Sequence, residues 1–107
     1  MSEVKLIDLK DCPAEGEIKF VELTHPVTEY PYPLAVFFAK DRYFVLTDTC
    51  KECGASLAVG TLNDMFVTCS GEEHPWNIKT GLLKYNRTIS MPVYRVEIKD
   101  EAIYIEI

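Results

Sequence analysis

The sequence is poor in basic residues, which limits the partners that it can bind. Lysine and arginine number 11 against 17 aspartates and glutamates, so the formal net charge is −6. A surface that binds nucleic acid needs dense positive charge to neutralise phosphates, and we therefore expect no nucleic-acid partner. The acidic surface suits docking onto a basic protein, or it serves only to keep the chain in solution.

Long apolar runs are also missing. No stretch approaches the ~20 residues that a membrane-spanning helix requires, and residues 1–10 lack the apolar core of a signal peptide. We therefore expect a cytoplasmic protein with no membrane partner. Thiols stay reduced in the cytoplasm, where clustered cysteines indicate a metal site more often than a disulfide.

The sequence also lacks helical periodicity. No stretch longer than ten residues repeats its apolar positions every 3.6 residues. Short apolar or alternating runs separated by turn residues predict strands at 4–9, 17–23, 34–39, 43–47, 65–68, 76–79, 82–85, 93–98 and 102–107. Hairpins are expected around residues 40–42, 80–81 and 99–101. The pattern predicts an all-β fold, a small antiparallel barrel or sandwich.

The rest of the chain divides into loops within one expected domain. Residues 24–33 contain three prolines, which lack the N–H group that a sheet requires, and we expect a loop there. Residues 60–64 are expected to form a connector. The 107 residues are enough for one hydrophobic core, and no repeat or low-complexity segment interrupts them. We therefore expect a single domain over residues 1–107.

Three of the four cysteines and one of the two histidines gather in two short polar loops. Cys50 and Cys53 are separated by two residues, a spacing that lets two thiolates chelate one metal ion. Cys69 and His74 would supply the third and fourth ligands from the second loop. Three thiolates and one imidazole form a standard set for structural zinc and can equally hold iron. The alternative is a cluster of reduced thiols that holds no metal.

Around these loops the sequence resembles the Rieske [2Fe–2S] domain. Such domains carry Cys-x-His-x-Gly-Ala-x-Leu, then a strand, then Cys-x2-His, an aromatic residue and a Thr-Gly hairpin. Here residues 50–57 read Cys-Lys-Glu-Cys-Gly-Ala-Ser-Leu, and residues 69–72 read Cys-Ser-Gly-Glu, followed by Trp76 and Thr80-Gly81. The ending 91–96 is similar to the family's Leu-x-x-Tyr-x-Val strand. The resemblance implies an antiparallel Rieske-like fold with both ligand loops at one tip.

The departures from the family pattern fall on the metal ligands. The family's two cysteine positions are kept as Cys50 and Cys69, whereas both of its histidine positions are glutamates, Glu52 and Glu72. A carboxylate is a hard anionic donor and is poorly suited to the outer iron. The proline of the third cluster-covering loop is also missing, near residues 86–90.

Three interpretations of the site follow from the resemblance. In the first, Cys50 and Cys69 bind the inner iron of a [2Fe–2S] cluster, and Cys53 and His74 bind the outer one. In the second, the chain holds no cluster, as in the small subunit of NADH-dependent nitrite reductase, which it also resembles. In the third, the same four residues hold a structural zinc ion.

The first interpretation implies a small electron-transfer protein or subunit of ferredoxin type, with a Cys3His site in place of Cys2His2. Its partner would be a redox protein, either a reductase or a component of an oxygenase–reductase system. The alternative function is that of a cluster-free accessory or docking subunit of a redox enzyme. We expect no catalytic residue, because the loop glutamates have no evident nucleophile or orienting partner.

Two further side chains carry expectations of their own. Trp76 is expected to pack beneath the loops as a core anchor. Cys12 is distant from the other cysteines in the sequence, and we expect it to serve only in packing. If no metal binds, we expect Cys50 and Cys69 to lie close enough to form a disulfide on oxidation.

Overall fold

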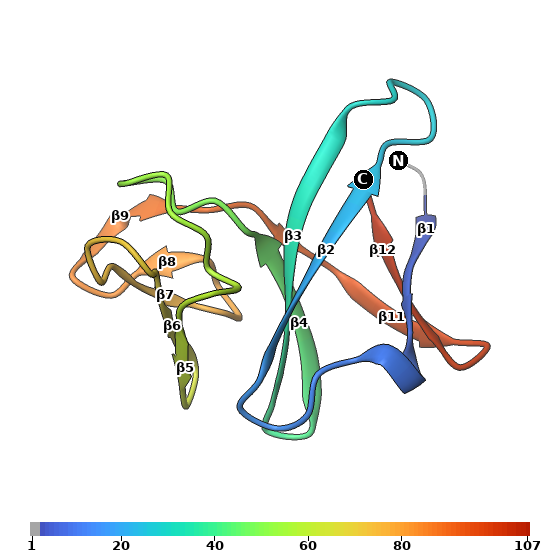
Figure 1. Cartoon of the computed structure of the whole chain (residues 1–107), viewed down its shortest axis with the longest axis horizontal. Helices are drawn as coiled ribbons and strands as arrows, with labels where there is room; N and C mark the ends of the chain where they lie inside the picture. The colour runs from blue at the N-terminus through green and yellow to red at the C-terminus, as the bar shows by residue number, and fades with distance from the viewer. Residues whose placement is uncertain (1–2) are drawn as a thin grey trace.

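The computed structural model describes residues 3–107, which form an all-β protein, as predicted (Figure 1). In chain order the elements are β1 (Glu3–Asp8), the 3-10 helix η1 (Leu9–Asp11), β2 (Ile18–Thr24), β3 (Pro31–Ala39), β4 (Arg42–Thr47), β5 (Thr61–Asn63), β6 (Phe66–Thr68), β7 (Pro75–Asn77), β8 (Leu82–Leu83), β9 (Asn86–Ser90), β10 (Val93–Tyr94), β11 (Val96–Lys99) and β12 (Ala102–Glu106). Within this part of the chain there is no α-helix, and no helix is long and apolar enough to cross a membrane. The first two residues of the expected domain lie outside the described residues.

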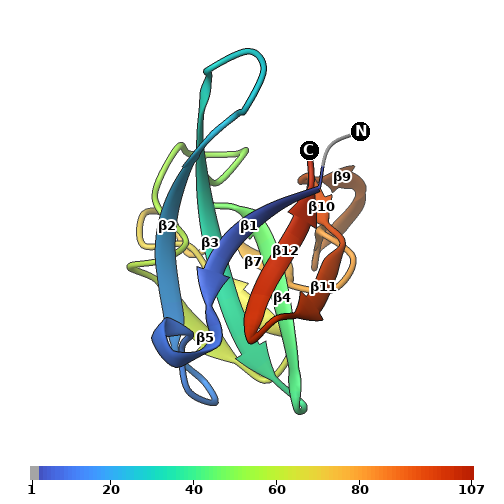
Figure 2. The same cartoon turned by 90° about the vertical axis from the view of Figure 1, so that its right-hand side faces the viewer.

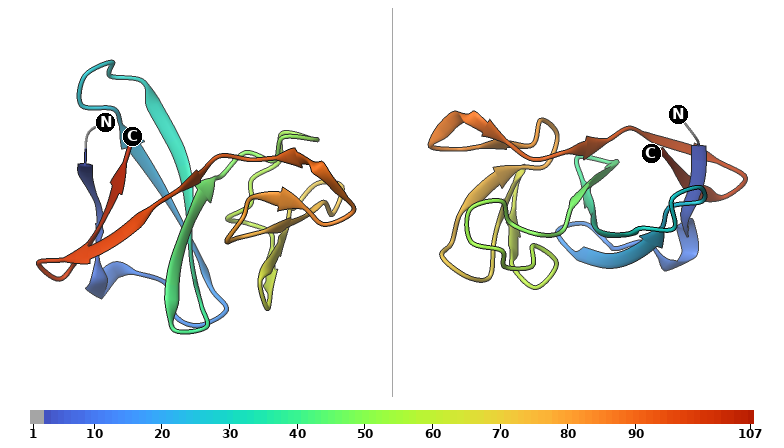
Figure 3. Two further views of the ribbon diagram at one scale, coloured as in Figure 1. Left: turned by 180° about the vertical axis from the view of Figure 1, so that it is seen from behind. Right: turned by 90° about the horizontal axis from the view of Figure 1, so that it is seen from above.

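The strands pair in three antiparallel sheets. One has the order β1-β12-β11, and a second has the order β10-β4-β3-β2. The third is a meander in which β5 to β9 follow one another in chain order. Figure 1 shows the meander on one side of the molecule, and Figure 2 looks onto β1, β12 and β11 on the opposite side. Seen from behind and from above in Figure 3, the yellow and orange meander again lies away from blue β1 and red β12.

Strand β3 is apolar throughout its second half because both of its faces are covered. Leu34 and Val36 belong to a buried cluster that includes Ile103 and Ile105 of β12. Their neighbour Phe37 points the other way, into a second cluster shared with the meander and the cysteine loops. Successive side chains alternate between the faces of a strand, so a strand between two cores reads as a continuous apolar run.

Two hairpins are closed by turns that the sequence predicted. Lys40 and Asp41 join β3 to β4 with φ angles of 55° and 60°, and Asp100 and Glu101 join β11 to β12 with 51° and 58°. Positive φ at both central residues is the signature of a type I′ turn, whose twist matches that of the strands it connects. These turns set the observed registers of the two hairpins.

The loop predicted for residues 24–33 is shorter than expected, because β3 already begins at Pro31. Pro31 and Pro33 both pair with β2. The carbonyl of Pro33 accepts a hydrogen bond from the Asp48 amide at 2.8 Å, on the side away from β2. The N–H and C=O of one residue in a strand point the same way, so the missing donors of both prolines also face away from β2. The ladder with β2 therefore tolerates them.

The run predicted as one strand at residues 93–98 is divided between two sheets. Val93 in β10 pairs with Leu46 of β4, whereas Val96 in β11 pairs with Ile105 of β12. The prediction of one continuous strand was wrong because local alternation does not reveal the point at which a chain changes sheets.

Two segments expected to be irregular are strands of the meander. The connector at residues 60–64 contains β5, which returns to β6 through a turn with Asp64 at a φ of 57°. Residues 86–90, compared above with a cluster-covering loop, form β9. Both strands are short and carry polar residues, so their sequences lack clear apolar alternation.

Candidate metal centre

The first cysteine loop follows β4 and turns back on itself. The Cys50 amide donates to the Ala55 carbonyl, and the Gly54 amide donates to the Cys50 carbonyl, both at 2.8 Å. Gly54 has a φ of 77°, in the left-handed region that glycine adopts without steric cost. An isolated bridge between Thr49 and Ser56 closes the loop at its base.

The second loop joins β6 to β7 and brings its two candidate ligands together at its base. The Cys69 amide donates to the His74 carbonyl at 3.1 Å, and the His74 amide donates to the Cys69 sulfur at 3.3 Å. Glu73 reverses the chain just before His74, with a φ of 58°. A separation of five residues in the sequence thus becomes direct contact between Cys69 and His74.

The structure brings together all four candidate ligands predicted from the sequence. The sulfurs of Cys50, Cys53 and Cys69 and a ring nitrogen of His74 all lie within 4.8 Å of one another. The Cys53 and Cys69 sulfurs are 3.4 Å apart. His74 Nδ1 is 3.7 Å from the sulfur of Cys50 and 3.7 Å from that of Cys69. The two loops lie on the meander side of the molecule, away from β1 and β12, as the predicted tip requires (Figure 1).

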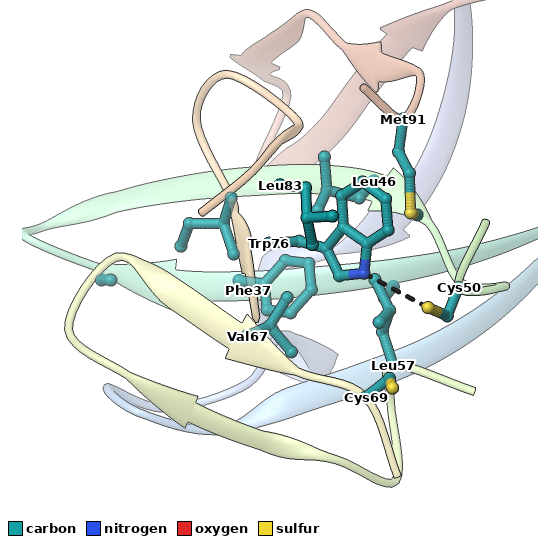
Figure 4. Close-up of a cluster of buried hydrophobic side chains, with 12 residues drawn as sticks. Phe37, Leu46, Cys50, Leu57, Val67, Cys69, Trp76, Leu83 and Met91 are labelled. Carbon is teal, nitrogen blue, oxygen red and sulfur yellow. Dashed lines mark hydrogen bonds between the residues drawn. The ribbon is translucent and has the colours of Figure 1, made fainter. Parts of the chain in front are cut away.

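Trp76 is the anchor beneath these loops, as expected from the sequence. Its side chain is fully buried, and Figure 4 shows the indole ring close to Phe37, Leu46 and Leu83. The indole N–H points to the Cys50 sulfur and donates a hydrogen bond at 3.3 Å (Figure 4). The sequence predicted the burial of Trp76, but it did not predict this hydrogen bond.

The donors differ in their exposure to solvent. Cys50 and Cys69 are 1% and 3% exposed, whereas Cys53 and His74 are half-buried. A centre held by all four would therefore be covered on one side by the protein core and reach the surface through Cys53 and His74.

The environment favours charged forms of two donors in the metal-free protein. Burial opposes ionisation of Cys69, but hydrogen bonds from the His74 amide and imidazole, assisted by Cys53 and the Gly71 amide, lower its pKa to about 6. The same contact with the Cys69 sulfur, followed by contact with Cys53, raises the pKa of His74. Cys69 and His74 therefore favour a thiolate and an imidazolium.

The other two thiols are shifted in opposite directions. Burial raises the pKa of Cys50, against the opposing hydrogen bond from Trp76. Backbone N–H groups of Glu72 and Ala55 lower the pKa of Cys53. Cys50 is thus the thiol that most favours its protonated form before a metal binds.

The glutamates at the family's histidine positions are not part of the donor group. Glu52 and Glu72 are exposed, and neither contributes to the group of side chains identified within residues 3–107. The nearest carboxylate oxygen of Glu72 is 4.0 Å from His74 Nε2, on the opposite side of the ring from the sulfurs. The ordinary Cys2His2 ligand set of a Rieske cluster therefore does not fit this site.

Asp48 positions the chain around the first loop and was missed by the sequence analysis. It is buried, and its carboxyl oxygens accept hydrogen bonds from the Ser56 hydroxyl at 2.6 Å and the Ala58 amide at 2.7 Å. Its backbone carbonyl also accepts from the Leu57 amide at 2.7 Å. No local pattern distinguishes Asp48 from a solvated aspartate before a loop, since its partners lie eight to ten residues away.

The two thiols expected to lie close both belong to the donor group. Cys50 and Cys69 lie within 4.8 Å of each other, and Cys53 also contacts Cys69, with 3.4 Å between their sulfurs. Cys12 packs against the other buried cluster, beside β12, which agrees with the packing role expected for it.

No family model matches the chain. Ferredoxin CarAc from Metapseudomonas resinovorans is 32% identical over 74 residues, which cover 68% of this chain and 69% of that protein. A chain in the complex of reduced oxygenase and oxidized ferredoxin of carbazole 1,9a-dioxygenase superimposes with a TM-score of 0.76 at 28% identity. That alignment covers 96% of this chain and 91% of the other.

Two more distant structures share the fold. Sphingomonas yanoikuyae B1 ferredoxin gives a TM-score of 0.82 at 23% identity and covers 98% of both chains. A protein assigned as the small subunit of nitrite reductase NADPH gives 0.80 at 17% identity and covers 100% of both. These likenesses confirm the predicted Rieske-like fold, and the identity to ferredoxin CarAc shows the family. The chain belongs to the Rieske-type ferredoxins.

Proposed function

We propose that this chain transfers electrons through an iron–sulfur centre held by Cys50, Cys53, Cys69 and His74. The observation that carries the proposal is the convergence of these four donors within 4.8 Å. Membership of the Rieske-type ferredoxins supports the electron-transfer role and an iron-containing centre. A bound iron centre would accept and release one electron at a time.

The chemistry of the donors suits thiolate-bound iron. Three soft sulfur donors and one imidazole are ligands that iron shares with zinc in tetrahedral sites. His74 presents Nδ1 to the sulfurs and Nε2 to the carboxylate of Glu72. Carboxylates commonly orient metal-binding histidines by accepting a hydrogen bond from the outer ring nitrogen, but Glu72 and His74 are 4.0 Å apart, which is too far for one. Glu72 therefore adds negative charge beside His74 and lies outside the donor group.

The same residues would set the reduction potential. Three anionic thiolates carry one more negative charge than the two thiolates of an ordinary Rieske site, which lowers the potential. Hydrogen bonds to the sulfurs oppose this effect, since they stabilise the more negative, reduced state. Such bonds come from Trp76 to Cys50 and from the His74 amide to Cys69.

We propose that the partner is a redox protein, an oxygenase or reductase component, that docks over the half-buried side of the centre. A similar chain occurs in the carbazole 1,9a-dioxygenase complex of an oxygenase with its ferredoxin. Cys53 and His74 bring the site to the surface, where Glu52, Glu72 and Glu73 are exposed. Negative charge around this opening would steer a basic partner surface toward the centre.

Anaerobic purification from cells supplied with iron and sulfide tests the proposal. We expect iron in the protein, visible absorption from sulfur-to-iron charge transfer, and bleaching of that absorption on one-electron reduction. Protein that stays colourless and free of iron under these conditions would show that the electron-carrier proposal is wrong.

Structural zinc in the same four donors is the second candidate. Three cysteines and one histidine make a complete tetrahedral set that leaves no position open, the arrangement typical of structural zinc sites. Purified protein that contains zinc and no iron would show that the site is structural. Absence of both metals would favour a cluster-free accessory subunit of a redox enzyme.

A further inference from the structure

The spacing of the four donors bears on the number of metal ions that they hold. A number of bound ions has meaning only if Cys50, Cys53, Cys69 and His74 bind metal, so the inference rests on the proposed function. The resemblance to Rieske domains implies two irons, but the family's histidines are replaced, so the number of ions depends on the donors that are present.

A [2Fe–2S] cluster makes a specific demand on its ligands. Each iron takes two protein donors and shares two bridging sulfides with the other iron. The four donors must therefore fall into two close pairs, with the irons and sulfides between the pairs. Donors that belong to different irons then cannot be in contact.

Every division of the four donors into two pairs violates this demand. If Cys50 is paired with Cys69, as the resemblance to Rieske domains implies, the Cys53 sulfur lies 3.4 Å from Cys69 across the two pairs. Pairing Cys50 with Cys53 leaves the same 3.4 Å contact between the pairs. Pairing Cys50 with His74 leaves His74 Nδ1 3.7 Å from the Cys69 sulfur across the pairs.

The observed distances match a single tetrahedral site instead. Metal–sulfur bonds of ~2.3 Å place two sulfurs of a tetrahedron about 3.8 Å apart, and a sulfur and a nitrogen slightly closer. The three contacts given above for these donors are 3.4 to 3.7 Å, and no pair is further apart than 4.8 Å.

The packing of the loops keeps the donors close. A Cβ atom added to Gly71 would lie 3.0 Å from the Ala55 Cβ and 3.1 Å from the Cys53 sulfur, so the second loop rests directly on the first. The Cys50 sulfur is held from the core side by the indole of Trp76. Separating the donors into two pairs would require these contacts to open.

We infer that Cys50, Cys53, Cys69 and His74 bind one tetrahedrally coordinated metal ion in place of a [2Fe–2S] cluster. In the electron carrier proposed above this ion is iron. Zinc has the same ligand chemistry, so the experiment must distinguish the number of ions from their identity.

Titration of the metal-free full chain with Co²⁺, under anaerobic conditions and without sulfide, measures the number of ions. We expect the intense visible bands of tetrahedral cobalt–thiolate coordination, with an end point of one equivalent per chain. Cys53→Ser and His74→Ala should abolish or shift these bands. Cys12→Ser is the matched control away from the site and should leave the bands and the end point unchanged. Circular dichroism checks that each variant is folded. Octahedral cobalt spectra, or an end point of two, would overturn the inference.

Iron, zinc and acid-labile sulfide in the protein as expressed separate the two proposals. One iron without sulfide supports both of them. One zinc without sulfide supports the single-ion site and overturns the electron carrier. Two irons with two sulfides overturn the single-ion site and leave the electron carrier standing. A chain without metal that also fails to bind Co²⁺ overturns both.

Discussion

The indole nitrogen of Trp76 donates a hydrogen bond to the Cys50 sulfur at 3.3 Å, and both side chains are buried. The contact joins the start of the first loop to the centre of the meander core, 26 positions further along the chain. One residue thereby supports the fold beneath the site and also supplies a polar contact to a candidate ligand. The two roles can be separated by two different substitutions.

Trp76→Phe removes the N–H donor while keeping an aromatic ring in the core. Because a hydrogen bond to a bound sulfur stabilises the reduced state, we expect the reduction potential of the iron-loaded protein to fall. Redox titration followed by visible absorption measures the change. An unchanged or higher potential in a folded, fully loaded variant would contradict this role of the indole.

Trp76→Ala removes the ring itself. We expect the free energy of unfolding of the metal-free protein to fall by about 3–5 kcal/mol, the usual cost of truncating a buried large aromatic residue. Urea denaturation measures it. The control is Tyr85→Ala, since Tyr85 is 80% exposed and its loss should change stability by less than about 0.5 kcal/mol. Equal effects of the two substitutions would show that Trp76 is not the anchor.

Asp48→Ala tests the buried carboxyl group that holds the chain after the first loop. Removing it leaves the Ala58 amide and the Ser56 hydroxyl without their acceptor, and we expect a loss of about 2–3 kcal/mol in stability. Weaker metal binding should accompany it, because the first loop loses its support. Asp11→Ala changes an exposed aspartate and serves as the control. Stability equal to that of Asp11→Ala would mean that these hydrogen bonds contribute little.

The contact between Cys69 and His74 predicts the pH dependence of the metal-free protein. The pKa of Cys69 is lowered from its ordinary 9.0 to about 6, so its alkylation rate should rise with pH around a midpoint near 6. His74→Ala removes the imidazole hydrogen bond and should move the midpoint upward. Mass spectrometry after brief alkylation at a series of pH values follows this site separately from Cys53.

The same shift also affects the stability of the metal-free fold. Since the folded-state pKa of Cys69 lies below its ordinary value, the contribution of this group is fully present above pH 9.0 and is lost as the pH falls through about 6. A midpoint for Cys69 that stays the same in His74→Ala would show that the imidazole does not stabilise the thiolate.

Histidine at positions 52 and 72 tests the family's own ligand set. Glu52→His and Glu72→His, combined with Cys53→Ser and His74→Ala to remove the competing donors, restore the Cys2His2 pattern around the two kept cysteines. We expect this variant to take up two irons and two sulfides and to show a higher potential than the unmodified protein, because imidazoles are neutral ligands. Iron and sulfide analysis decides the result, with Glu52→Gln as a control that keeps the metal content of the unmodified protein. No cluster in a folded variant would mean that the loops no longer permit two-iron geometry.

The sequence by itself determined the all-β class, the tight hairpins around residues 40–41 and 100–101 and the identity of the four converging donors. These features depend on local signals: apolar alternation, polar residues at tight turns, and cysteines and histidine confined to two loops. The burial of Trp76 was expected from its place after the second loop, at the aromatic position of the Rieske pattern. The resemblance to Rieske domains supplied the arrangement of the loops at one tip, which the structure confirms.

Tertiary structure alone decided which strands pair and how the donors are spaced. Residues 93–98 alternate like one strand, yet β10 and β11 belong to different sheets. Asp48 became a structural residue only because distant backbone and hydroxyl donors fold around it. The Cys53 and Cys69 sulfurs meet across the two loops at 3.4 Å, and no spacing in the sequence specifies that distance. Local periodicity encodes the conformation of a segment, whereas contacts between segments depend on how their surfaces pack in three dimensions.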